Sequence, residues 1–143
     1  MTNSYVAFDD EQLNEILSKP FPDGVLCLNL LKFRNAVSVD GKNLSGAETY
    51  QLYAEKVVPL ISEVGGVVVA LGDCDYAVIG PKGEWDSMII VWYPSAEAFH
   101  SMVTSEIYRN AVEFRNISLD DSRLIPIPAP PGYSPSISAI GAP

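Results

Sequence analysis

An apolar strand leads directly into a capped helix at Gly83-Glu-Trp-Asp-Ser-Met-Ile-Ile-Val-Trp-Tyr-Pro-Ser-Ala-Glu-Ala-Phe99. Successive side chains of a strand point to opposite faces, and the strand from Asp86 to Tyr93 is apolar on both of them. A strand of this kind must be covered on both sides. Helices of the same chain can cover one face. In a chain of 143 residues, a second copy of the protein is the simplest cover for the other face.

The composition indicates one folded domain, because 143 residues with 48% hydrophobic content can bury a substantial core. The net charge of -9 comes from 18 acidic and 9 basic residues. Such a surface repels phosphate backbones, so we expect no nucleic-acid partner. No apolar run is long enough to span a bilayer and no basic amphipathic stretch is present, so we expect no membrane contact. The N-terminus lacks the features of an export signal, which favours a cytoplasmic location.

Capping patterns mark the predicted helices. The pattern Asp9-x-x-Gln12 predicts a short helix that ends near Ser18. The capping box Ser45-x-x-Glu48 begins a long helix that contains Pro59 and ends at Gly65-Gly66, where a left-handed residue is expected. Two further helices are expected, one after the N-cap Ser95 and one after the N-cap Ser105.

Apolar alternation marks the predicted strands. They are Val25–Arg34, Val67 to about Leu71 or as far as Ile79, Asp86–Tyr93 and Ser122–Ile127. Between the first strand and the long helix, Asn35–Leu44 is expected to be a polar loop with a turn at Asp40-Gly41.

The order strand, helix, strand, strand, helix, strand is the split βαβ pattern of a ferredoxin-like α+β domain, with a four-stranded antiparallel sheet and helices on one face. We assign this domain to residues 25–127. Residues 1–24 form an N-terminal helical extension, and residues 128–143 form a Pro-rich C-terminal tail. Tyr133, Ile137 and Ile140 of this tail could dock on a partner.

A set of short motifs resembles the domain-of-unknown-function family thirteen-thirty, within the dimeric α/β-barrel superfamily. In chain order they are Asn29-Leu-Leu-Lys-Phe33, Tyr50-x-x-Tyr53-Ala54, Val58-Pro59-Leu60, Gly65-Gly66, Trp85-Asp86, Pro94-Ser95-x-Glu97-Ala98, Ser105-x-x-Tyr108 and Asp121-Ser122-Arg123. The resemblance implies a ferredoxin-like fold whose open sheet face meets a symmetry mate, so that a barrel closes across a homodimer. It implies no established reaction. The wider superfamily includes small monooxygenases, lactone isomerases and haem proteins, which is an analogy of fold alone.

Asn29 is a polar residue on an otherwise apolar strand face, which it shares with Val25, Cys27, Leu31 and Phe33. If this face points into the barrel, the amide needs another side chain, water or a ligand as its partner. Two roles for Asn29 are therefore open: its amide binds a ligand, or its amide is hydrogen-bonded by neighbouring groups of the protein.

Trp85 and Asp86 stand where the third strand begins, beside a loop that contains glycine. An aromatic ring next to a carboxylate at the rim of a sheet could bind and orient a small molecule. The alternative is a packed indole and a hydrogen-bonded loop carboxylate.

Tyr53, Tyr108 and Arg115 lie on the predicted helices. We expect Tyr53 to fill the core with its hydroxyl satisfied, and Arg115 to pair with Asp120 or Asp121. If Arg115 instead points into a cleft, it becomes the anchor for a substrate carboxylate.

No cofactor or metal is expected. A single histidine, His100, and two distant cysteines, Cys27 and Cys74, do not make a metal site, and helical phase places His100 outward. We expect both cysteines to be free thiols. In haem-binding members of the wider superfamily the axial histidine aligns with Val112, and valine cannot ligate iron.

Three functions compete on this evidence. The first is a cytoplasmic homodimer that binds a small organic molecule between sheet and helices. The second is a non-catalytic assembly or regulatory module that uses the dimer surface and the tail. The third is a cofactor-independent enzyme of monooxygenase or isomerase type, with acid–base chemistry at the polar candidates. These candidates are Asn29, Tyr53, Trp85, Asp86, Tyr108, Arg115 and Asp121.

Overall fold

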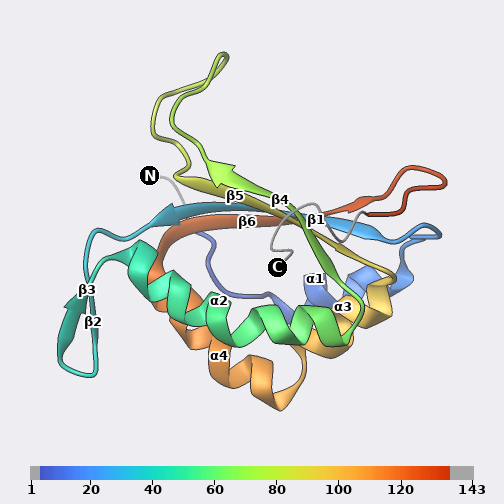
Figure 1. The fold of residues 1–143 in the computed structure, drawn as a ribbon, viewed down its shortest axis with the longest axis horizontal. Helices are drawn as coiled ribbons and strands as arrows, with labels where there is room; N and C mark the ends of the chain where they lie inside the picture. The colour runs from blue at the N-terminus through green and yellow to red at the C-terminus, as the bar shows by residue number, and fades with distance from the viewer. Residues whose placement is uncertain (1–3, 136–143) are drawn as a thin grey trace.

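The computed structural model describes residues 4–135, and its centre is a four-stranded antiparallel sheet with the helices on one face (Figure 1). The sheet order is β4-β5-β1-β6, which is the order of a ferredoxin-like fold. The predicted fold class is therefore confirmed. The strands are β1 (Val25–Phe33), β4 (Val67–Asp73), β5 (Ser87–Tyr93) and β6 (Leu119–Pro128). The helices are α1 (Asp10–Glu15), the short 3-10 helix η1 (Ile16–Ser18), α2 (Gly46–Glu63), α3 (Ala96–Val103) and α4 (Glu106–Ser118).

The helices begin at the predicted caps. At the start of α2 both bonds of the capping box are present: the Glu48 amide donates to Ser45 Oγ at 3.0 Å, and the Ser45 amide donates to Glu48 Oε1 at 2.8 Å. Gly65, with φ of 83°, supplies the left-handed residue after α2. Ser95 and Ser105 cap α3 and α4, where their side chains accept from the Ala98 and Tyr108 amides. These caps could be identified from the sequence, because each N-cap side chain bonds to an amide only three positions further along the chain.

The expected polar loop before α2 is a β-hairpin instead, formed by β2 (Val37–Val39) and β3 (Lys42–Leu44). Its turn lies at the predicted Asp40-Gly41, where both residues have positive φ, 49° and 79°. A two-residue turn of this kind matches the twist of paired strands, so it brings even short polar segments into register.

The connection between β4 and β5 is longer than the strand pattern suggested. β4 ends at Asp73, and the alternative that it extends to Ile79 is wrong. Residues 74–86 project from the sheet on the side away from the helices (Figure 1), and Val78 and Ile79 are 88% and 95% exposed. An isolated pair of strands this far from the core gains too little burial to be stable.

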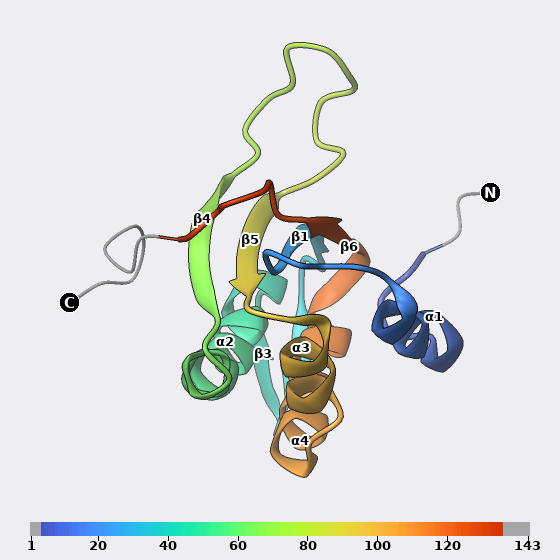
Figure 2. The ribbon, with the colours of Figure 1, turned by 90° about the vertical axis from the view of Figure 1, so that its right-hand side faces the viewer.

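The two faces of the sheet are buried to different degrees. Toward the helices, Val25, Cys27 and Leu31 of β1 are almost fully buried. On the other face, the described residues place no helix (Figure 2). Its apolar side chains are half-buried, or exposed in the case of Ile125 and Ile127 at 42% and 41%. The half-buried residues on this open face are Leu26, Leu28, Leu30, Val67, Met88, Ile90 and Trp92.

Within residues 4–135, no helix is long and apolar enough to cross a membrane. The start of the tail packs on the domain: the Ala129 amide donates to Gly24 O at 3.0 Å, and Ala129 is buried. Ile137 and Ile140, proposed above as docking residues, lie outside the described residues.

Candidate functional site

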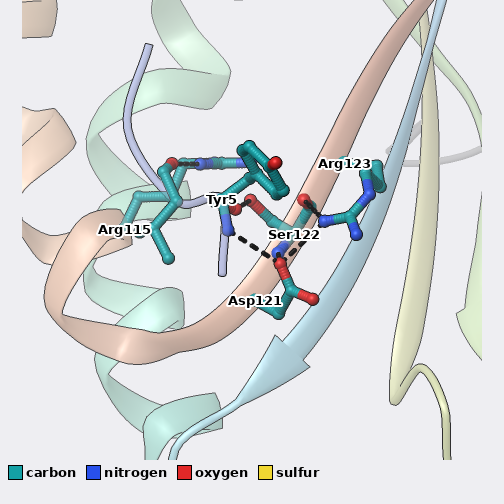
Figure 3. A network of polar contacts seen from close by, with 6 residues as sticks. Tyr5, Arg115, Asp121, Ser122 and Arg123 are labelled. Carbon is teal, nitrogen blue, oxygen red and sulfur yellow. Dashed lines mark hydrogen bonds and ion pairs between the residues drawn. The ribbon is translucent and has the colours of Figure 1, made fainter. Parts of the chain in front are cut away.

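The N-terminal segment is tied to strand β6 and helix α4 by hydrogen bonds (Figure 3). The Tyr5 amide donates to Asp121 Oδ1 at 2.9 Å, and Ser122 Oγ donates to Tyr5 O at 2.7 Å. Arg115 Nη1 donates to Val6 O at 2.8 Å. Segments more than 100 positions apart in the sequence therefore meet at one place, beside the edge strand of the sheet.

A cavity of about 900 Å³, open to solvent on one side, lies at this place between the N-terminal segment with α1 and strand β6. Arg115 of α4 and Ser122 of β6 contribute polar groups to its lining, and Asp9, Glu15 and Lys19 are charged lining residues on the exposed α1 side. Its volume falls in the range of small-molecule sites, about 300–1,000 Å³. The apolar walls are Phe8, Leu13, Ile16, Phe99, Leu124 and Pro126.

Arg115 is buried, with 4% of its surface exposed. The expected ion pair with Asp120 or Asp121 is wrong, because within residues 4–135 no carboxylate lies within 4.0 Å of Arg115. Asp120 lies 3.8 Å from Arg34, and Asp121 lies 2.7 Å from Arg123. Arg115 faces the interior side of α4, whereas these two carboxylates follow the helix and pair with nearer cations.

A cluster of buried tyrosines lies beside Arg115. The hydroxyl oxygens of Tyr53 and Tyr108 are 2.8 Å apart, and the Tyr50 ring packs on Tyr53 with centroids 5.2 Å apart. Burial raises the pKa of all three hydroxyls, and the nearby Arg115 charge only partly opposes this. The three side chains are therefore neutral at physiological pH and can donate hydrogen bonds.

Trp85 and Asp121 meet at Arg123. The Arg123 guanidinium lies 5.3 Å from the Trp85 ring centroid and 5.0 Å from that of Tyr5. Burial raises the pKa of Asp121, but hydrogen bonds from the Tyr5 amide, Arg123 and the Ser122 amide outweigh it and leave this pKa below its usual value. Asp121 is thus ionised and holds the N-terminal segment against β6 by accepting a hydrogen bond from the Tyr5 amide.

Asn29 and Asp86 lie away from the cavity. The Asn29 face packs toward the helices, and Asn29 Nδ2 donates to Cys27 O at 3.4 Å and to Ile89 O at 3.3 Å. Asp86 accepts from the Phe33 amide at 2.8 Å and pairs with Lys32 at 3.2 Å. These contacts correspond to the local, structural alternative for both residues.

Of the seven candidates, the cavity lining includes Arg115. Tyr53 and Tyr108 lie behind it, and Asp121 and Trp85 lie near its rim through Arg123. The contribution of the N-terminal segment was missed. A signal for it was present, because Phe8 and Leu13 flank the Asp9 cap at the spacing of a hydrophobic staple, and both residues line the cavity.

Within residues 4–135, no group of three or more histidine, cysteine, aspartate or glutamate side chains could hold a metal ion. His100 is half-buried, and its Nε2 lies 2.8 Å from Asn14 Oδ1, so it links α3 to α1. Both cysteines are free, and burial raises the pKa of Cys27 to about 12, which keeps this thiol protonated and unreactive.

Residues 41–125 match a family described as a domain of unknown function (DUF1330). A protein of unknown function from Rhodopseudomonas palustris is 30% identical, with a TM-score of 0.80 over 89% of this chain and 98% of that one. A methylated form of that protein gives 33% identity and a TM-score of 0.80 over 92% and 100% of the two chains.

A dimeric protein of unknown function and ferredoxin-like fold from Bacteroides fragilis is 13% identical, with a TM-score of 0.50 over 77% of this chain and 100% of that one. At this identity the likeness concerns the fold alone. No curated protein matches the chain significantly. The match over residues 41–125 and the Rhodopseudomonas palustris relative confirm the predicted resemblance: the chain belongs to the DUF1330 family.

Proposed function

We propose that this protein is a homodimer that binds a small organic molecule in the cavity between the N-terminal segment and β6. The observation that carries the proposal is the buried Arg115, which opens onto a cavity of about 900 Å³ with mostly apolar walls. Binding sites for small molecules combine such walls with a few fixed polar groups. The hydrogen bond to Val6 O holds the guanidinium in place, so it is oriented before a ligand arrives.

The open sheet face supports the dimer. Two rows of apolar side chains on β1 and β5 lie on a face that no helix among the described residues covers, and a contiguous exposed apolar area often marks a protein contact. Residues 74–86 project from the same side of the sheet, with Tyr76 73% exposed beside Val78 and Ile79. A second copy seated on the open face would cover both features. The Bacteroides fragilis relative is described as dimeric, in line with this arrangement.

Two further functions use the same features. An assembly module would need the open face but not the cavity. A cofactor-independent enzyme would need an acid or base at the cavity. Among the described residues, Asp9, Glu15 and Lys19 line the cavity, and the protonated Tyr53 and Tyr108 lie behind Arg115. We place the protein in the cytoplasm, which suits the free Cys27 and Cys74. The cavity favours ligand binding over assembly alone.

A thermal-shift screen with metabolite acids, phenols and lactones tests the proposal. Ala7 is an exposed residue of the cavity lining, so Ala7→Trp should obstruct the cavity at little cost to folding. Ala36, exposed and outside the lining, provides the matched control Ala36→Trp. We expect hits that stabilise the wild-type and Ala36→Trp proteins but not Ala7→Trp. Absence of any hit, or equal stabilisation of all three proteins, would contradict ligand binding in this cavity.

A further inference from the structure

The positive charge of Arg115 has no negative partner in the described part of the chain. The residue is only 4% exposed, yet the hydrogen bond that it makes in the described part of the chain goes to an uncharged acceptor, Val6 O at 2.8 Å. Buried charges in proteins are normally paired, because an unpaired one costs several kcal/mol. A buried cation at a cavity wall is thus prepared for an anion from outside.

The surrounding charges make Arg115 the preferred place for such an anion. The lining carboxylates of Asp9 and Glu15 are already engaged, Asp9 by the Gln12 amide at 3.0 Å and Glu15 by Lys19 at 3.2 Å. Arg123, the other lining arginine, is paired with Asp121 at 2.7 Å. Arg115 is therefore the lining cation with neither a carboxylate partner nor free access to bulk water among the described residues.

The geometry selects among anions. A guanidinium carries five N–H donors in a planar fork that matches a carboxylate. A phosphate monoester carries close to two negative charges and would need more than one buried cation to offset them. The apolar walls, with the rings of Phe8 and Phe99 among them, suit a hydrophobic body attached to the acid group.

We propose, as a refinement that rests on the ligand-binding function above, that the ligand is a monocarboxylic acid with an apolar body, whose carboxylate binds Arg115 while the body lies against Phe8 and Phe99. The acid group would approach the guanidinium from the cavity, on the side not used by Val6 O. The overall charge of -9 repels anions at long range. Selection for an acid therefore depends on this one local charge.

The test compares aryl-alkanoic acids with their carboxamides by isothermal titration calorimetry. Each pair has the same body and differs in charge at one end. We expect the wild-type protein to bind the best acid at least about tenfold more tightly than its amide, the size of effect that a charge-assisted hydrogen bond gives. Arg115→Met should reduce this ratio to about one. Arg109→Met removes the same charge from an exposed position of α4 and should leave the ratio unchanged.

Arg115→Lys provides a second variant if Arg115→Met does not fold, because it keeps the charge and loses the fork; it should lower the ratio several-fold. Ala7→Trp should weaken the acid and the amide alike. If acid and amide bind the wild-type protein equally, the carboxylate inference is wrong and the ligand-binding function stands. If neither compound class nor any neutral compound binds, the ligand-binding function itself is wrong. An acid preference that persists in folded Arg115→Met, or acid binding that Ala7→Trp does not weaken, places the acid elsewhere and overturns the inference.

Discussion

The hydroxyl oxygens of Tyr53 on α2 and Tyr108 on α4 lie 2.8 Å apart in the buried layer between the helices and the sheet. One hydroxyl must donate and the other accept, so each satisfies the other. With Arg115 beside them, they form a polar core that connects the helices to the wall of the cavity.

Removing both of these hydroxyls should destabilise the protein by less than the sum of the two single removals. Tyr53→Phe and Tyr108→Phe each leave a buried hydroxyl without its partner, at a cost of about 1–3 kcal/mol in free energy of unfolding. The double variant leaves no orphan, so its cost should be less than the sum of the single costs. Urea denaturation at one fixed protein concentration measures all four proteins. Strictly additive costs would show that the two hydroxyls do not interact.

Stability should fall above about pH 10. Burial raises the pKa of Tyr50, Tyr53, Tyr93 and Tyr108, so the folded protein keeps protons that the unfolded chain loses near a pKa of about 10. The stabilisation is complete below that pH and is lost as the pH rises. Each tyrosine contributes a slope of about 1.4 kcal/mol per pH unit. Denaturation curves on both sides of pH 10 measure this slope.

Tyr108→Phe serves as the control for the alkaline effect, because it removes one titrating group from the same core. Its slope above pH 10 should be smaller by about 1.4 kcal/mol per pH unit. A wild-type stability that stays constant through this range would mean that the tyrosines ionise in the folded state.

Gly46→Ala should destabilise the start of α2. A Cβ at Gly46 would collide with the backbone oxygens of Arg34 and Ser118, which cannot move without shifting β1 or the end of α4. Overpacking of this kind costs about 1–3 kcal/mol. Gly72→Ala is the matched control, because no atom of residues 4–135 lies within 4 Å of a Cβ placed there. Thermal unfolding of the two variants compares them; equal melting temperatures would contradict the close approach at Gly46.

Local patterns in the sequence predicted much of the fold. Ser45 and Glu48 identify the start of α2, because the capping box is completed within four residues. The apolar run Met88–Tyr93 identifies β5, because it makes both faces of the strand apolar. The hairpin at Asp40 and Gly41 was missed, since each of its strands, Val37–Val39 and Lys42–Leu44, is too short for alternation to identify it.

The site depends on contacts that no local pattern encodes. The environment of Arg115 is set by Val6, 109 positions earlier in the chain, and its helical position alone equally suited a surface ion pair with Asp121. Likewise, Asn29 has a partner on the neighbouring strand, Ile89 O, that emerges only from the register of β1 with β5. Sequence reasoning therefore predicts which elements form, and tertiary packing decides which polar residues are left to bind a ligand.

Charge on the open sheet face should prevent the pairing of two copies. Ile90 lies on this face of β5, opposite Leu28 of β1. Ile90→Glu would place a desolvated carboxylate in the contact, which is strongly unfavourable without a cation partner. Ile107→Glu is the control, because Ile107 is 63% exposed on α4, on the helix side of the sheet.

Sedimentation equilibrium of the wild-type protein and these two variants tests the proposed homodimer most directly. A wild-type mass of twice the 15.5 kDa chain, retained by Ile107→Glu and halved by folded Ile90→Glu, is the predicted result. A wild-type protein that remains a 15.5 kDa monomer at concentrations well above those in cells would contradict it.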